Sequence, residues 1–397
     1  MKIIFPLTLL ALSSSAAFAA SDTRSHAMGG TSVASSNYLS ASIANPSLLQ
    51  KTVKENDDFG ILLPSVNFQI QDQDELFDSI DDFQDSFENL SDLLEQNNYQ
   101  NGGVSEDELK RARAEVAANL ARLNGQAFIE GNIAAATAIP TQAGGFSLFV
   151  NADFDLVANV MIDDNDLVVI ANADTPDELE SIDSETQFVG ASITDAGFSY
   201  SNQYSISEQI IYWSVTPKFQ QVDTFNYVVS VDEFDEDDFD ANDYTNSDSQ
   251  FNIDFGLATE LMENVTLGFT ASNLIENEFK AITHRGLTPI YTVGPEFKLG
   301  VAYANDTVTF AADVDLNAAE RLSLEEKSQY ARVGLELNGF DWVQLRAGYS
   351  HDFKGEQDDF VSVGFGFSPF GTVRLDVTAQ KANDNELGAG IQLAFTI

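Results

Sequence analysis

The chain has 397 residues, no cysteine, and 63 Asp and Glu residues against 19 Lys and Arg residues, which gives a formal net charge of −44. Nucleic-acid affinity depends on neutralising phosphates with Lys and Arg, so this balance excludes direct binding of nucleic acid. A chain without cysteine has no disulfide and no thiol chemistry, and its stability must come from a large core or from a closed sheet.

The first 19 residues have the features of a secretory signal peptide. A basic start at Lys2 precedes an apolar run from Ile3 to Leu12 and a small-residue cleavage pattern that ends at Ala19. The apolar run is shorter than the ~20 residues that a spanning helix needs. We therefore expect residues 1–19 to be removed on export and the mature chain to begin at Ala20.

Fourteen later segments alternate between apolar and polar residues, which is typical of β-strands with one greasy face. They lie at residues 59–71, 128–139, 144–157, 187–202, 209–231, 250–260, 265–274, 296–304, 307–316, 329–338, 341–351, 359–368, 372–381 and 387–397. Many are about ten residues long, the length that a tilted strand needs to cross a bilayer, whereas strands of soluble domains are typically about five or six. A soluble sandwich would alternate as well, but its strands would be shorter.

The connections between these segments are alternately short and long. Short periplasmic turns, longer extracellular loops and an even number of strands are characteristic of outer-membrane barrels. We therefore predict an all-β fold, an antiparallel transmembrane β-barrel of about 14 strands over residues 59–397. Its apolar face should contact lipid, and its polar face should line a lumen with paired charges. The charged positions on that face include Arg332, Glu336, Arg346, Arg374, Asp313, Asp315 and Asp376.

Residues 74–123 interrupt the strands with a helical period and form a predicted extracellular insertion. In the first helix, apolar residues recur every three or four positions, at Leu76, Ile80, Phe83, Phe87 and Leu90. A second helix begins at the capping box formed by Ser105 and Glu108. Two interpretations stay open: the helices only cover each other and the barrel mouth, or their apolar stripe is a lid on a path for hydrophobic ligands.

Two acidic runs, residues 72–95 and 232–243, raise the question of cation binding. Neither has the spaced oxygen ligands and turn glycine of a calcium loop, so solvated faces are expected, although divalent cations at the acidic loops stay an open alternative. The sequence has no phosphate loop, dinucleotide fingerprint or metal-ligand cluster. We therefore predict neither a cofactor nor a metal centre.

Catalysis is disfavoured by the placement of the three histidines, His26, His284 and His351. The trio Ser350, His351 and Asp352 offers the residue types of a hydrolase. Adjacent residues of a strand point to opposite faces, however, so these three cannot form a catalytic triad. We predict that the protein is not an enzyme.

The segment of residues 20–58 carries two further motifs. One is Met28, Gly29 and Gly30 followed by Val33, and the other is Asn45 and Pro46 followed by two leucines. This arrangement resembles the amino-terminal segment of FadL-like outer-membrane barrels and, more closely, TraF-like plasmid-transfer proteins. The resemblance implies a fourteen-stranded barrel with an N-terminal plug that gates hydrophobic compounds. Glycines suit close packing inside a lumen, and a proline suits the bend before the first strand.

The sequence therefore predicts a protein in the outer membrane of a Gram-negative bacterium, in contact with outer-membrane lipid. Its expected function is that of a plugged channel for small or hydrophobic solutes, or an envelope component of a conjugal-transfer-type system. The alternative is a non-transporting structural or adhesion barrel that presents acidic loops.

Overall fold

The computed structural model describes residues 22–52, 59–72, 75–99, 103–123, 125–141, 143–179, 181–207, 209–231, 241–319, 327–340, 342–355, 358–369, 371–382 and 386–396. The predicted signal peptide, most of the 232–243 acidic run, and Asp74 at the start of the predicted insertion lie outside these residues.

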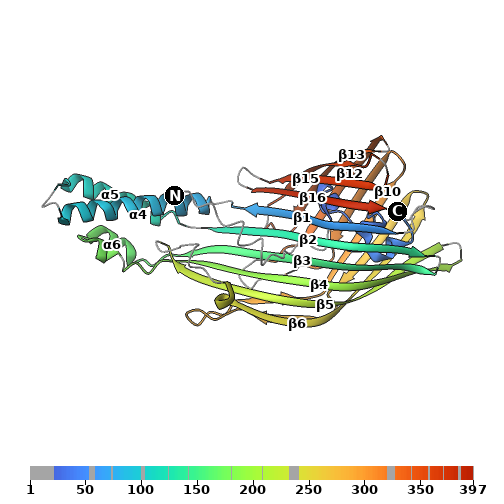
Figure 1. Ribbon diagram of the computed structural model, residues 1–397, viewed down its shortest axis with the longest axis horizontal. Helices are drawn as coiled ribbons and strands as arrows, with labels where there is room; N and C mark the ends of the chain where they lie inside the picture. The colour runs from blue at the N-terminus through green and yellow to red at the C-terminus, as the bar shows by residue number, and fades with distance from the viewer. Residues whose placement is uncertain are drawn as a thin grey trace.

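Fourteen of the described strands close into an antiparallel barrel (Figure 1). They are β1 (Gly60–Gln71), β2 (Gln126–Thr141), β3 (Gly144–Met161), β4 (Glu185–Ile206), β5 (Gln209–Ser230), β6 (Thr245–Met262), β7 (Val265–Ser272), β10 (Glu296–Ala304), β11 (Val308–Asp315), β12 (Tyr330–Phe340), β13 (Val343–Asp352), β14 (Phe360–Phe367), β15 (Val373–Lys381) and β16 (Glu386–Thr396). Strand β1 pairs with β16, which closes the wall and satisfies its backbone hydrogen bonds. The predicted fold class is confirmed.

Apolar side chains cover the outside of the barrel and polar side chains fill its interior. On β13, for example, Leu345 is 54% exposed, whereas the next residue, Arg346, is 4% exposed. Alternate residues of a strand point to opposite faces, so one face of each strand meets lipid and the other meets the lumen. The orientation predicted from the sequence is therefore correct.

The wall has two unequal parts. Strands β2 to β6, here called the tall wall, are 16 to 22 residues long, whereas β7 and β10 to β16, the short wall, are 8 to 11 residues long. Strand β1, with 12 residues, lies between the two parts. At roughly 3.3 Å per residue, a strand of 22 residues extends about 70 Å and one of 8 residues about 26 Å. In Figure 1 the tall wall reaches well beyond the ends of β15 and β16 on the side of the helices.

Four helices lie beyond the end of the tall wall (Figure 1). They are α4 (Leu76–Tyr99), α5 (Glu106–Leu120), α6 (Asp166–Asn172) and α7 (Pro176–Leu179). Asp72 stabilises the start of α4, because its carboxylate accepts hydrogen bonds from the backbone N–H groups of Leu76 and Phe77 at 2.7 and 3.1 Å. The sequence predicted α4 and α5 but not α6 and α7. Among the described helices, none is both long enough and apolar enough to span a membrane.

A hairpin that the sequence did not predict lies within the barrel, against the inner face of the tall wall. Its strands are β8 (Asn277–Lys280) and β9 (Ile290–Val293). Phe279 and Tyr291 pack against inward-facing residues of β3 to β5, and the Tyr291 hydroxyl donates to the Asp155 carboxylate at 3.0 Å. The hairpin therefore narrows the lumen near the helical end.

Candidate functional site

A plug formed by residues 22–52 fills the lumen. It contains α2 (Thr23–Ala27), α3 (Tyr38–Ala41) and the 3-10 helix η1 (Pro46–Leu49), and most of its side chains are buried. Its contacts reach strands around the whole barrel: the Thr23 backbone N–H bonds Ser65 on β1 and Gln392 on β16, and the Asn45 amide reaches the Leu257 carbonyl oxygen on β6. The described part of the N-terminal segment is thus a separate body inside the wall.

The predicted glycine motif is where the plug approaches the wall most closely. Gly29 and Gly30 have φ angles of +70° and +86°, which residues with a Cβ rarely adopt. A Cβ on Gly29 would lie 2.7 Å from the backbone N of Tyr349, and a Cβ on the facing Gly348 would overlap the backbone N of Gly29. The Gly29 N–H also donates to the Ser362 hydroxyl at 2.9 Å. Glycine on both partners therefore allows backbone-to-backbone contact.

The second predicted motif organises the plug internally. The Asn45 side-chain oxygen accepts a 2.7 Å hydrogen bond from the Ser47 hydroxyl, while its amide donates to the Val33 carbonyl oxygen at 2.7 Å. Pro46 occupies the start of η1, where the absence of an N–H group has no cost. Asn45 thereby joins the two halves of the plug.

Buried ion pairs, here called the Arg24 latch, attach the plug to the short wall. The Arg24 guanidinium makes two hydrogen bonds to the Glu336 carboxylate, at 2.9 and 3.1 Å. Arg346 bonds the same carboxylate at 2.6 Å and reaches Asp376 at 2.7 Å. All four side chains are buried, so the latch is a chain of charges shielded from water.

A second attachment point is Asp313 on β11. One oxygen of its carboxylate accepts hydrogen bonds from the backbone N–H groups of Ser32 and Val33, at 2.6 and 2.9 Å. The other oxygen has no hydrogen-bond partner among the described residues. The short wall thus binds the plug backbone through a carboxylate as well as through the latch.

A cavity of about 550 Å³ lies between the plug, the walls and the β8–β9 hairpin. Of the plug motif residues, Gly29, Gly30 and Pro46 line it, whereas Met28 and Asn45 are packed against the wall. His26 also lines the cavity, and burial lowers the pKa of its imidazole to about 4, which leaves it neutral near pH 7. The cavity is therefore bounded on one side by the predicted motif.

The sequence predicted a lumen with paired charges and named charged positions on its inner face, but it did not say which of them pair. Arg332 pairs with Asp315 at 2.7 Å, and Arg346 pairs with Glu336 at 2.6 Å and with Asp376 at 2.7 Å. The sequence analysis did not identify Lys218. Its ammonium is buried between the carboxylates of Asp195, at 2.8 Å, and Asp254, at 3.0 Å. Alternation would have placed all three on inner faces, but their meeting depends on the register between β4, β5 and β6.

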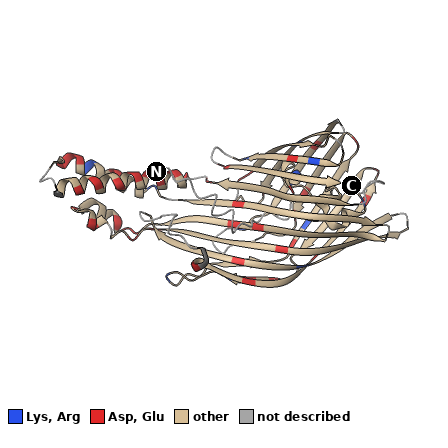
Figure 2. Ribbon diagram, in the orientation of Figure 1, with Lys and Arg blue, Asp and Glu red and all other residues tan. Residues whose placement is uncertain are grey.

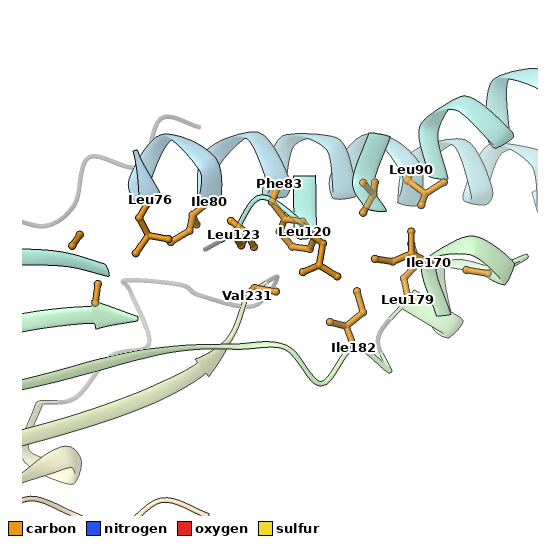
Figure 3. Close-up of a cluster of buried hydrophobic side chains, with 14 of the residues drawn as sticks. Leu76, Ile80, Phe83, Leu90, Leu120, Leu123, Ile170, Leu179, Ile182 and Val231 are labelled. Atoms are coloured by element: carbon orange, nitrogen blue, oxygen red, sulfur yellow. The ribbon is translucent and has the colours of Figure 1, made fainter. Parts of the chain in front are cut away.

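The apolar stripe of α4 is covered by protein (Figure 3). Leu76, Ile80, Phe83 and Leu90 are at most 7% exposed, and Phe87 is half-buried beside them. They share one cluster with residues of α5, α6, α7 and the top of the tall wall. The other members that Figure 3 labels are Leu120, Leu123, Ile170, Leu179, Ile182 and Val231.

The cluster lies on the outer face of the tall wall and not over the lumen. Its β3 member, Leu156, is an even number of residues from Leu148, which is 57% exposed on the outside, so both side chains point outward. Asp153 and Asp155 are an odd number of residues from Leu148 and line the cavity. The five stripe residues are not among those that line the cavity. A role for them in a ligand path stays a prediction.

The serine, histidine and aspartate of the hydrolase-like trio are not assembled. Ser350 lines the cavity, whereas exposed His351 bonds Asp359 at 2.8 Å through Nδ1. Asp352 instead accepts a hydrogen bond from the Gln329 backbone N–H at 2.7 Å. Within the described part of the chain, no group of three or more His, Cys, Asp or Glu side chains has the arrangement of a metal site.

Comparisons with known proteins agree with this architecture. A family model described as "F plasmid transfer operon, TraF, protein" matches residues 42–315. Three solved structures share the fold: a Pseudomonas aeruginosa FadL homologue (TM-score 0.54, 10% identity, 96% of this chain and 99% of that one), the Ralstonia pickettii toluene transporter TbuX (0.53, 11%, 95% and 98%) and the P. putida toluene transporter TodX (0.51, 13%, 97% and 99%). No curated protein matches the chain.

Proposed function

We propose that this chain, which belongs to the F plasmid transfer operon TraF protein family, is a plugged channel for small solutes in the outer membrane of a Gram-negative bacterium. The observation that carries the proposal is a lumen closed by a separate segment held through polar contacts. Two structures of the same fold are named toluene transporters, which supports solute passage as the role of such a barrel.

Opening requires the plug to leave the short wall. The Arg24 latch and the Asp313 contact are hydrogen-bonded ion pairs and backbone bonds, which water can replace once they are exposed. The strands themselves are joined by backbone hydrogen bonds that have no substitute in lipid. Plug movement is therefore the less costly way to open the barrel.

A hollow on the outer face of the wall offers hydrophobic solutes a second path in this proposal. It has a volume of about 700 Å³ and a lining that is almost entirely apolar, including Leu148, Phe198 and Phe219. Phe149 and Lys218 belong to this hollow and also to the cavity inside. Pro217 beside them lacks the N–H group that a continuous ladder uses, so the wall is weakened at this level.

Conductance in planar bilayers tests the channel. Full-length Arg24→Gln should open more often than the wild type, because it removes the plug's charge from the latch. The matched control is Arg113→Gln, which alters the half-exposed pair with Asp174 on the helices and should leave conductance unchanged. Equal conductance of Arg24→Gln and wild type, with the plug shown to be released by protease sensitivity, would overturn the proposal.

The rival function is a structural or adhesion barrel, and it draws support from the helices, whose outward faces are rich in acidic residues (Figure 2). No conductance in bilayers together with retained cell attachment would favour that function.

An envelope role in conjugal transfer makes a separate prediction: deleting the gene in a donor strain should lower plasmid transfer frequency. Full-length protein should restore it.

A further inference from the structure

The connection between β7 and β10, residues 273–295, folds into the barrel and contains the β8–β9 hairpin. At one end of this connection, the Asn252 amide on β6 donates to the Ile275 carbonyl oxygen at 3.0 Å. At the tip of the hairpin, the Arg285 guanidinium lies 3.0 Å from the Glu185 carboxylate, where β4 begins. The hairpin therefore lies across the inner face of the tall wall, from β6 to the start of β4.

The wall beneath the hairpin departs from the polar interior that a membrane barrel normally has. Five inward-facing residues of β3 to β5 are apolar and buried there, and they share one cluster with Phe279, Tyr291 and Val293 of the hairpin. The five are Val157, Val189, Ala191, Ile193 and Val222, here called the apolar strip. Without the hairpin the apolar strip would face the water of the lumen, at a cost in free energy. The wall sequence is therefore matched to a hairpin that stays in place.

Polar side chains of the wall also bind the backbone of the hairpin. The Asn226 amide donates to the Ile282 carbonyl oxygen at 2.7 Å. The Thr224 hydroxyl and the Asn246 amide both donate to the Lys280 carbonyl oxygen, at 3.1 and 2.9 Å. Backbone groups that an isolated hairpin would leave to water are thus bonded by the wall. Together with the apolar burial, these bonds indicate a fixed element and not a mobile lid.

The opposite face of the hairpin lines the cavity. Glu278 and its cross-strand neighbour Thr292 lie on that face, whereas the next residues along the chain, Phe279 and Val293, point to the wall. Across the cavity lie residues of the short wall, among them Arg332. A solute that enters from the helical end therefore passes between the hairpin and the short wall on its way to the plug.

We propose that the β8–β9 hairpin is a fixed size filter that decides which solutes reach the plug from the helical end of the barrel. The inference rests on the proposed channel function and restricts its solutes to compact molecules. The cavity that the hairpin borders, at about 550 Å³, is in the size range of small-molecule sites. Because the wall holds the hairpin, movement of the plug does not widen this entrance.

Thiol labelling in intact cells tests the filter on the full-length protein. The chain has no cysteine, so Ala44→Cys, at a partly exposed plug position that lines the cavity, provides a single reporter. The two reagents are N-ethylmaleimide and a maleimide on a polyethylene glycol chain too large to cross the outer membrane elsewhere. The small reagent should label the reporter and the large one should not. Equal labelling rates for the two reagents, or no labelling by either, would overturn the filter.

A matched pair of substitutions in the reporter chain locates the filter at the hairpin. Val293→Asn places an amide against the apolar strip and should release the hairpin, which raises labelling by the large reagent about tenfold or more. Thr292→Asn introduces the same side chain on the cavity face and should leave labelling unchanged. An equal rise in both variants would overturn the filter.

A second variant keeps the test decisive if Val293→Asn disturbs folding. It replaces residues 277–293 with a short Gly–Ser linker, and heat-modifiable migration shows whether the barrel is intact. Both reagents should then label the reporter at similar rates. Exclusion of the large reagent by an intact linker variant would overturn the filter, whatever the result with Val293→Asn.

Bilayer recordings of Arg24→Gln separate this inference from the channel proposal. Size-selective labelling that depends on the hairpin, without conductance, would retain the filter and refute the channel. Conductance together with labelling that ignores the size of the reagent would retain the channel and refute the filter.

Discussion

The short wall and the tall wall of this barrel contact different parts of the molecule. The short wall carries most of the polar attachments of the plug: Glu336 and Arg346 of the latch, Asp313, and the glycines that face Met28 and Gly29. The tall wall carries the β8–β9 hairpin, the opposed carboxylates Glu130 and Asp155, and the helices packed on its outer face. One side of the barrel therefore binds the plug, and the other shapes the cavity.

The difference follows from strand length. Strands of 8 to 11 residues are just long enough for the apolar band of a membrane, so their inner faces lie at the depth of the plug. Strands of 16 to 22 residues continue past that band, and their apolar outer faces must be covered by protein beyond the lipid. The helices provide that cover.

The largest effect is expected from breaking the short-wall side at its central charge. Glu336→Gln leaves Arg24 and Arg346 buried without their shared carboxylate, which should cost roughly 3–5 kcal/mol of plug binding. The control Asp174→Asn, at an exposed ion pair, should cost about 0–1 kcal/mol.

The measurement uses a single reporter thiol, Ala41→Cys, in a chain that has no other cysteine. Ala41 is fully buried in the plug, so thiol labelling in urea reports plug release. Equal labelling of Glu336→Gln and its unchanged parent would show that the latch does not hold the plug.

On the tall-wall side, the matched pair Phe83→Ala and Phe87→Ala probes the helical cover. Phe83 is fully buried and should lose roughly 3–5 kcal/mol of helix packing, whereas half-buried Phe87 should lose clearly less. Limited proteolysis of the helices would show which variant loses more packing stability, and heat-modifiable migration would show that the barrel is intact.

The ligand-path hypothesis adds that Phe83→Asp and Phe87→Asp impair uptake of a hydrophobic probe. Wild-type uptake by both would leave the helices as a structural cover.

The contact between glycines allows a test of the short wall without any change of charge. Gly348→Ala places a methyl group on the backbone of Gly29 and should displace the plug at a cost of about 1–3 kcal/mol. Gly339→Ala, where nothing lies within 4 Å of the added carbon, is the control. If thiol labelling of the plug is the same in both, the close approach at Gly348 is not required for plug binding.

The sequence predicted the number of strands and their faces because alternation is a local property. It predicted the full length of β5 at residues 209–231, but other tall-wall strands came out too short where polar residues interrupt the alternation, as at Thr245 to Ser249 on β6. The Lys218 pairs depend on register between three strands, and the side on which the α4 stripe packs depends on tertiary contacts. The plug motif was recognised through its resemblance to FadL-like and TraF-like proteins, and the structure adds that close backbone contact leaves no room for a side chain at Gly29.

Plug release should also depend on pH through His26, whose pKa is influenced by Asp22 and Arg332. Burial lowers its pKa from 6.5 to about 4, so the bound plug disfavours the proton that a released plug accepts. The contribution of neutral His26 to the free energy of plug binding is complete above pH 6.5. It is lost as pH falls toward 4, by at most roughly 3 kcal/mol. Thiol labelling of the Ala41→Cys reporter should therefore rise between pH 6.5 and 4, and His26→Gln should flatten that rise. An equally steep rise in His26→Gln would assign the pH dependence to the carboxylates of the short wall instead.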